Sequence, residues 1–109
     1  MGRSARIIIV ILASCAAPAH ADDALIAAGR AIAAHNCSRC HAIGPDDSSA
    51  NPKSPPFRTL SQKYPLSYLE EALGEGIMVG HEGPEMPNFR LDATEIEALT
   101  AFLDSIQKK

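Results

Sequence analysis

Residues 37–41 read Cys37-Ser38-Arg39-Cys40-His41, so two thiols stand three residues apart and an imidazole directly follows the second. In a tight turn, thiols at this spacing can each add across one vinyl group of the same porphyrin. The histidine can then reach the porphyrin iron from one side. The stretch therefore predicts one covalently bound haem c, with Cys37 and Cys40 as its thioethers and His41 as the proximal iron ligand.

Three other chemistries use a pair of cysteines at this spacing. A dithiol redox pair is typical of alternating strands and helices, and this chain shows almost no strand pattern. A zinc site needs a fourth ligand, for which only His35 or His81 is available, and there is no second CxxC. A disulfide between Cys37 and Cys40 would close a small strained loop and leave His41 without a role. Haem attachment accounts for all three residues.

Residues 1–21 are typical of a cleaved export signal. Arg3 and Arg6 make the start positive, residues 7–13 form a short apolar run, and Ala19-His20-Ala21 places small residues where a signal peptidase cuts. The run is too short for a permanent membrane span. We therefore expect a periplasmic protein, because bacteria attach c-type haem outside the cytoplasmic membrane.

A second interpretation of the same region concerns Cys15. The stretch Leu12-Ala13-Ser14-Cys15 resembles a lipoprotein box, in which the cysteine is acylated and tethers the protein to a membrane. The alternative is that Cys15 is a small apolar residue late in the signal. We favour the view that Cys15 is only a residue of the cleaved signal, because a helix start follows Ala19-His20-Ala21 directly.

Cleavage after Ala21 leaves residues 22–109 as a single domain. The formal charge of −3 becomes −5 once Arg3 and Arg6 are removed, which argues against a nucleic-acid partner and predicts a basic patch on a protein partner. Five aromatic residues and no tryptophan make a small core. A buried porphyrin would supply the missing apolar volume. We expect the domain to be monomeric and to contain no transmembrane span.

The spacing of apolar residues predicts an all-α fold. The first helix has Asp22 and Asp23 at its start, and the last has a capping box formed by Asp92 and Glu95. Gly29 lies inside the first helix, where it costs stability unless another helix crosses closely there. The predicted elements are helices over 24–35, 67–73 and 92–107, a short helical turn over 57–63, and irregular stretches over 42–56 and 77–91.

The faces of two of these helices can also be predicted. The central helix is expected to stop at Gly74 and Gly76 and to expose its glutamates, Glu70, Glu71 and Glu75, on a solvated face opposite the leucines Leu66, Leu69 and Leu73. The last helix is expected to have an apolar stripe of Ile96, Leu99, Leu103 and Ile106, with Phe102 beside it.

A candidate for the second iron ligand lies in Gly83-Pro84-Glu85-Met86-Pro87-Asn88-Phe89, which has too many helix breakers to be regular. Met86 there predicts a distal axial ligand, although a methionine can also simply fill a core gap. Met78 and His81 are rival ligands, and His35 is expected to be an exposed helix-end residue. A thioether opposite His41 leaves iron no open position and raises its reduction potential.

Pro55-Pro56-Phe57 places a rigid backbone without N–H donors beside an apolar ring. The carbonyl of Pro55 can accept a hydrogen bond from the imidazole nitrogen of His41 that does not bind iron. Such a bond orients the ring and raises its basicity. We therefore expect Pro55 to support the proximal ligand.

The order of these features resembles that of a small class I c-type cytochrome. A helix, the motif at 37–41, a loop with Pro55, a central helix, Met-Pro-x-Phe at 86–89 and a last helix cover nearly all of residues 22–109. The resemblance implies three main helices and loops wrapped around one haem, and a monohaem carrier of single electrons between periplasmic or membrane-bound redox partners, with no catalytic residues. Alternatives are a haem subunit of a larger oxidoreductase, or a gas- or peroxide-reactive protein if Met86 does not bind iron.

The family's fold also implies that the first and last helices cross near the haem, with Gly29 meeting Leu99 and Phe102. Two features depart from the family pattern. Ala33 stands where an aromatic residue often precedes the first haem cysteine by four positions, and tryptophan, often found near the haem propionates, is absent. Three residues remain as candidates for propionate contacts: Arg58, Tyr64 and Arg90.

Overall fold

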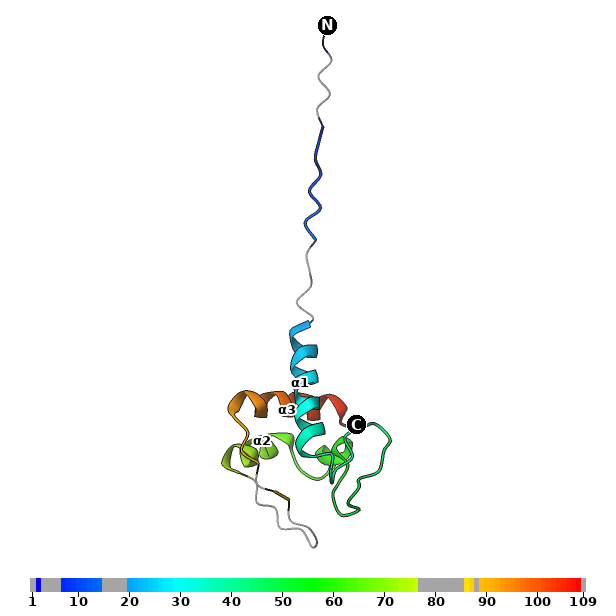
Figure 1. The fold of residues 1–109 in the computed structure, drawn as a ribbon, viewed down its shortest axis with the longest axis vertical. Coiled ribbons are helices and arrows are strands. Elements are labelled where there is room, and N and C mark those ends of the chain that lie inside the picture. The colour runs from blue at the N-terminus through cyan, green and yellow to red at the C-terminus, as the bar shows by residue number, and fades with distance from the viewer. Residues whose placement is uncertain (1, 3–6, 15–19, 77–85, 88, 109) are drawn as a thin grey trace.

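The computed structural model describes residues 2, 7–14, 20–76, 86, 87 and 89–108. These residues form helices and loops without any strand, as the all-α prediction requires. Figure 1 shows α1 and α3 lying crosswise, with α2 and the 3₁₀ helix η1 below them. The bounds are α1 (His20–Asn36), η1 (Phe57–Gln62), α2 (Leu66–Glu75) and α3 (Ala93–Ile106).

The first helix begins earlier than predicted. It starts at His20, so Asp22 and Asp23 lie inside its first turn instead of preceding it. Alanine has the highest helix propensity, and Ala21 lets the helix continue toward the N-terminus. The two carboxylates still favour this end because they lie at the positive end of the helix dipole. The helix ends at Asn36, whose side-chain amide donates to Ile32 O at 3.1 Å.

Gly29 is where α1 and α3 approach most closely. A Cβ atom at this position would overlap the backbone carbonyl of Ala98 and lie 2.8 Å from Cβ of Phe102. The predicted contact with Phe102 is confirmed, and the backbone of Ala98 is an additional close neighbour that was not predicted. The reason is that the two helices meet backbone to backbone, which only a residue without a side chain permits.

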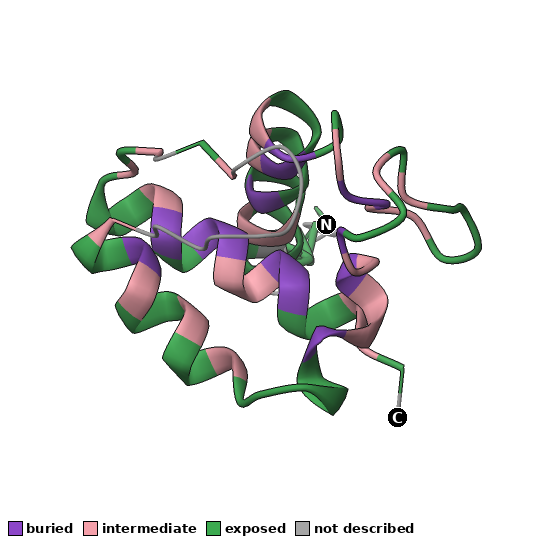
Figure 2. Cartoon of the chain, turned by 90° about the horizontal axis from the view of Figure 1, so that it is seen from below, coloured by how far each residue is buried: buried purple, intermediate pink, exposed green. Residues whose placement is uncertain are grey.

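Among the described residues, the last helix supplies more of the core than any other element. Asp92 accepts from the N–H of Glu95, and Glu95 accepts from the N–H of Asp92, so the predicted capping box is present. The core-facing residues of α3 are Ile96, Ala98, Leu99, Phe102 and Leu103, with Ile106 partly buried. Figure 2 shows the buried residues gathered where the helices meet. The predicted apolar stripe is therefore correct.

The central helix α2 contributes one buried and two partly buried leucines, Leu73, Leu66 and Leu69. It ends at Gly76, which adopts a φ of 87° that other residues rarely reach. Gly74, also expected to stop the helix, lies within it. The predicted solvated face is confirmed, because the glutamates of this helix are exposed: Glu70, Glu71 and Glu75.

Residues 42–56 are irregular, as predicted, and hydrogen bonds hold them in place. The amide of Asn51 donates to Cys40 O at 3.1 Å, and the amide of Phe57 donates to Ala42 O at 2.9 Å. The Arg58 guanidinium donates to Asp47 O at 2.7 Å. This loop therefore returns the chain to the turn that follows α1.

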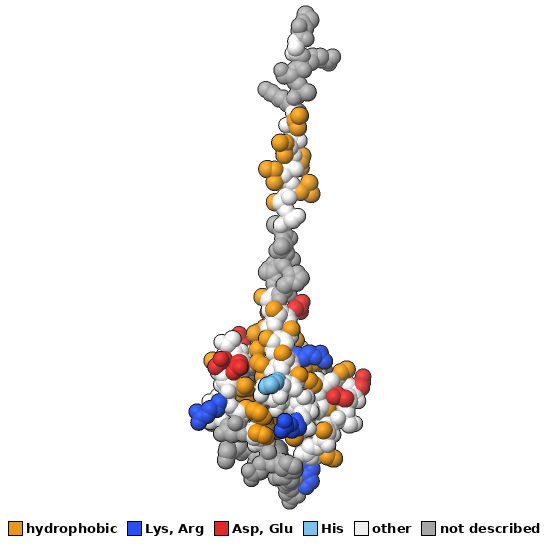
Figure 3. Space-filling model, in the orientation of Figure 1, with side chains coloured by type: hydrophobic (Ala, Val, Ile, Leu, Met, Phe, Trp, Pro, Cys, Tyr) orange, Lys and Arg blue, Asp and Glu red, His pale blue; other side chains and the backbone are white. Residues whose placement is uncertain are grey.

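Several expectations lie outside the described residues. They concern Cys15, Met78 and His81, and most of the stretches 1–6, 15–19 and 77–85. Residues 7–14 are described and expose their apolar side chains, which Figure 3 shows on the segment that leaves the helical domain. In the described part of the chain, no helix has the length and apolar character needed to cross a membrane.

Candidate functional site

The two thiols and the imidazole lie in a tight turn at the end of α1. The amides of Cys37 and Ser38 both donate to Ala33 O, and those of Cys40 and His41 both donate to Cys37 O. These bonds continue the last turn of the helix and fold the motif back on itself. Cys37 and Cys40 are both free thiols. The turn therefore presents three chemically active groups within five residues.

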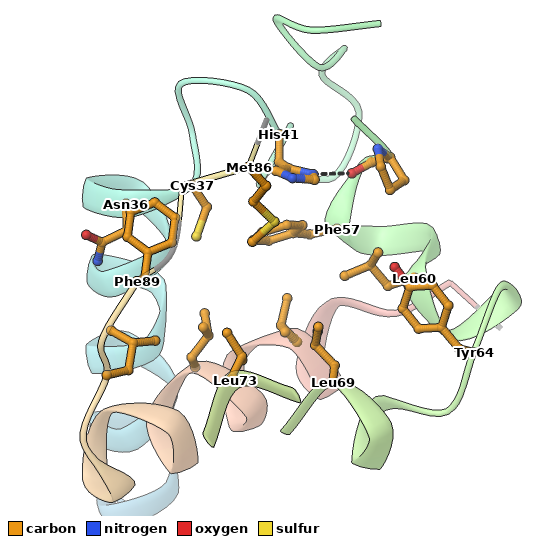
Figure 4. A pocket seen from close by; sticks show the side chains of 14 residues that line it. Asn36, Cys37, His41, Phe57, Leu60, Tyr64, Leu69, Leu73, Met86 and Phe89 are labelled. Atoms are coloured by element: carbon orange, nitrogen blue, oxygen red, sulfur yellow. Dashed lines mark hydrogen bonds between the residues drawn. The ribbon is translucent and has the colours of Figure 1, made fainter. Parts of the chain in front are cut away.

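The imidazole of His41 is oriented by a backbone carbonyl. Its Nδ1 lies 2.8 Å from Pro55 O, and Figure 4 shows this bond as a dashed line. A carbonyl oxygen only accepts, so Nδ1 carries the hydrogen and Nε2 carries the lone pair. The hydrogen bond predicted for Pro55 is thus present, and it leaves the tautomer that binds a metal through Nε2.

The ring of Phe57 packs against His41, with centroids 4.8 Å apart and planes tilted by 36°. Phe57 is the first residue of η1 and is buried. The carbonyl of Pro55 and the ring of Phe57 therefore restrain the imidazole together. Because both come from the segment 55–57, the position of η1 sets the orientation of His41.

An apolar pocket opens between this turn and the helices. Counted out to its open mouth and with the solvent there included, the space within it is about 640 Å³. Figure 4 shows Leu69 and Leu73 of α2 across the pocket from His41 and Met86. Leucines from three elements line it: Leu60 from η1, Leu69 and Leu73 from α2, and Leu99 and Leu103 from α3.

A second hollow of about 690 Å³ adjoins the first and shares His41, Met86, Cys37, Asn36 and Phe89 with it. Its other lining residues are more polar and include Cys40, His35 and Arg39. The two hollows are therefore parts of one site, apolar within and polar at the mouth. All four predicted site residues line it: Cys37, Cys40, His41 and Met86.

Burial changes the acidity of one thiol. Loss of hydration raises the pKa of Cys37 from 9.0 to about 11, because the charged thiolate is disfavoured in apolar surroundings. A thiol with this pKa is protonated at neutral pH, and thioether formation removes the ionisable group altogether. The pocket therefore suits a thioether at Cys37 better than a thiolate ligand.

The donor set fits a haem better than a bare metal ion. The thiol of Cys37, the imidazole of His41 in its Nδ1–H tautomer and the thioether of Met86 line the apolar space, and the thiol of Cys40 lines the adjoining hollow. Soft sulfur and imidazole are the axial donors found in cytochromes. Among the described residues, no group of three His, Cys, Asp or Glu side chains could hold a metal ion. The described residues therefore contain no cluster of side chains that supports the zinc interpretation.

The candidates for propionate contacts and the helix-end residue His35 lie in different surroundings. Tyr64 lines the pocket, whereas Arg58 donates to Asp47 O and Gly44 O and so braces the loop at 44–47. Arg90 is exposed. His35 is exposed near the end of α1, as predicted, and lies at the mouth. Tyr64 is thus the candidate that the pocket's lining supports for a propionate contact.

Asn36 and the leucines of α2 were not predicted as site residues. Asn36 lines both hollows, and its position directly before Cys37 is a signal that could have identified it. Leu69 and Leu73 were predicted to share one face of a helix. That this face covers the pocket depends on how α2 packs, which sequence periodicity does not specify.

Comparison with known proteins places the chain in a family. The family model described as "Cytochrome c" matches residues 26–107, which include the motif at 37–41 and Met86. Searches of curated proteins and of solved structures found no match. Proteins of this family carry covalently bound haem c with its iron and generally transfer electrons to and from redox partner proteins. The match covers most of the chain, and the chain therefore belongs to the cytochrome c family.

Proposed function

We propose that this protein is a monohaem electron carrier in which His41 and Met86 are the two axial ligands of the haem iron. The observation that carries the proposal is the 2.8 Å hydrogen bond between His41 Nδ1 and Pro55 O, beside an apolar pocket that Met86 also lines. The bound haem would supply one-electron chemistry, with iron alternating between Fe(II) and Fe(III). Cys37 and Cys40 would hold the ring as thioethers.

The two proposed ligands have distinct effects on the iron. The bond to Pro55 increases the electron donation of His41, which favours Fe(III). The thioether of Met86 favours Fe(II) and raises the reduction potential relative to a second histidine. With both axial positions filled by side chains, a gas or peroxide finds no open position. Outer-sphere electron transfer is then the remaining chemistry, and it requires no catalytic residue.

Electrons would enter and leave at the mouth of the pocket, which Arg39 and His35 line. Both residues are exposed. Charges beyond about 10 Å are screened at physiological salt, so these local groups influence docking more than the acidic balance of the whole chain. We therefore propose a redox partner with acidic groups at its contact surface, in place of the basic patch suggested by net charge.

The proposed location is the periplasm, after cleavage of residues 1–21. Cleavage after Ala21 would shorten α1 by His20 and Ala21 and leave Asp22 and Asp23 in its first turn. Mass spectrometry of the exported protein tests this proposal. A mature chain that begins at Asp22 would support it, whereas a diacylglycerol-modified Cys15 would show that the protein is membrane-tethered.

Visible and near-infrared spectra of the native protein and of Met86→Ala test the ligand assignment. The native oxidised protein should be low-spin and show a sulfur-to-iron charge-transfer band, and Met86→Ala should lose that band. Met78→Ala and His81→Ala are matched controls, since both residues were rival ligands, and they should retain it. Reduced Met86→Ala should also bind carbon monoxide at the vacated position.

Two results would contradict the proposal. If Met86→Ala keeps the native spectrum while His81→Ala or Met78→Ala loses it, the distal ligand has been assigned wrongly. If the native reduced protein binds carbon monoxide rapidly and tightly, the iron has an open position. The second result would favour a gas- or peroxide-reactive protein over a carrier.

A further inference from the structure

The C-terminal end of α3 is joined to η1 by the side chain of Gln107. Its Nε2 donates to Phe57 O at 2.7 Å and to Leu103 O at 2.8 Å. Its Oε1 accepts from the amide of Ser61 at 2.8 Å. One amide side chain therefore makes three short hydrogen bonds, two to the first and fifth residues of η1 and one to α3 itself.

These bonds reach the imidazole through Phe57. The amide of Phe57 donates to Ala42 O, next to His41, and its carbonyl accepts from Gln107. Its ring packs on the imidazole at 4.8 Å. Phe57 is thus held on one side by the turn that carries His41 and on the other by the end of α3. The carbonyl of Pro55, which accepts from His41 Nδ1, lies two residues before Phe57.

We propose that Gln107 is a positioning residue for the axial histidine: by fixing η1 against the end of α3, it holds Pro55 O and the Phe57 ring in place against His41. The proposal rests on the proposed function, in which His41 binds the iron. Gln107 does not line the pocket, so it acts through η1, by its hydrogen bonds to Phe57 and Ser61. It would tune how strongly His41 donates to iron.

A backbone hydrogen bond in the same region allows the role of the Gln107 side chain to be separated from that of the backbone. The amide of Lys108 donates to Arg58 O at 2.9 Å, so the backbone after α3 already contacts η1. That bond lies at the second residue of η1 and leaves the carbonyl of Phe57 to Gln107. Removing the side chain should therefore loosen the start of η1 selectively, while the end of α3 stays attached.

Gln107→Ala and the isosteric Gln107→Glu test the proposal. A carboxylate at 107 keeps an acceptor for the Ser61 amide but cannot donate to Phe57 O. Ser105→Ala is the matched control, because Ser105 Oγ donates to Phe102 O at 2.6 Å within the same last turn of α3 and that bond does not reach η1. All three substitutions lie outside the pocket.

The readouts are hydrogen exchange of His41 Nδ1–H in the reduced holoprotein and the midpoint potential. Both Gln107 variants should exchange this proton about threefold faster or more than the native protein, because the accepting carbonyl moves more freely. Their midpoint potentials should rise, since a weaker bond at Nδ1 reduces donation to Fe(III). Ser105→Ala should match the native protein in both measurements.

Outcomes separate this proposal from the assignment of His41. The proposal is overturned if both Gln107 variants have the same His41 Nδ1–H exchange rate and midpoint potential as the native protein. It is also overturned if Ser105→Ala changes these two quantities as much as the Gln107 variants do, because Gln107 then has only a general structural role. If the native protein lacks a low-spin spectrum dependent on His41, the proposed ligation itself fails. A normal native spectrum with unaffected Gln107 variants therefore overturns the positioning role alone.

Discussion

At the scale of single residues, the site depends on a hydrogen bond that sets the tautomer of one imidazole. The carbonyl of Pro55 requires the hydrogen to be on Nδ1 of His41, and in the neutral ring the lone pair is then on Nε2, the nitrogen that we propose binds iron. Pro55 is suited to this because its ring fixes φ and the following Pro56 restricts ψ, the angle about which the carbonyl turns. A flexible residue would make the same bond less rigidly.

Pro55→Ala should keep the carbonyl but loosen it. We expect a faster exchange of His41 Nδ1–H and a small rise in the midpoint potential, since a net hydrogen bond contributes about 1 kcal/mol and is only partly lost. Potentiometric titration and NMR exchange of the reduced holoprotein measure both effects. Pro52→Ala, an exposed position in the same loop, is the control and should change neither. An identical response in the two variants would show that Pro55 has no special role.

At the scale of elements, the crossing of α1 over α3 positions the haem-binding turn. The motif begins directly after α1, so any displacement of that helix moves Cys37 relative to α3. Gly29 sets the distance between the helices, because its missing Cβ leaves room for the carbonyl of Ala98. The fully buried Ala33 lies one turn further along α1. The two residues of α1 that the structure describes as buried, Gly29 and Ala33, are thus both small.

Gly29→Ala should destabilise the holoprotein. The added methyl would overlap the Ala98 carbonyl, and overpacking of this kind costs about 1–3 kcal/mol. Gly74→Ala is the matched control, because it lies within α2 and a Cβ there meets nothing within 4 Å. That control should gain about 0.5–1 kcal/mol from helix propensity. Denaturant unfolding followed by circular dichroism compares them, and a stabilised Gly29→Ala would refute the close crossing.

At the scale of the whole molecule, the haem completes the core. Leucines from η1, α2 and α3 line one apolar pocket. Without haem, the domain would contain an apolar cavity at this position. Cavities lower the free energy of unfolding in proportion to their volume.

Haem removal should accordingly unfold much of the domain. We expect Cys37→Ser/Cys40→Ser, which cannot attach haem, to lose far-UV helical signal and cooperative thermal unfolding. The Ser105→Ala holoprotein is the control for a substitution that leaves the pocket unchanged. Native helicity and an unchanged unfolding midpoint in the haem-free double variant would show that the four helices pack without the cofactor.

Charge at the pocket mouth should govern the rates of small redox reagents. Arg39→Glu should slow reduction of the anion ferricyanide by about twofold or more at low salt and speed that of the cation hexaammineruthenium(III). Both differences should shrink as salt rises. Lys63→Glu makes the same change in charge at an exposed residue that lines neither hollow, and its effect should be smaller. Equal effects of the two variants would indicate that electrons do not pass at this mouth.

The sequence by itself determined the features whose causes are local. The spacing of Cys37, Cys40 and His41 indicated a single turn that carries all three groups. The capping box indicated where α3 begins, and the periodicity of apolar residues predicted the helical class. The tertiary structure decided the rest: that Gly29 meets the Ala98 carbonyl, and that Gln107 contacts Phe57 fifty residues away. Long-range contacts depend on how helices pack in three dimensions, and residue spacing along the chain carries no record of that packing.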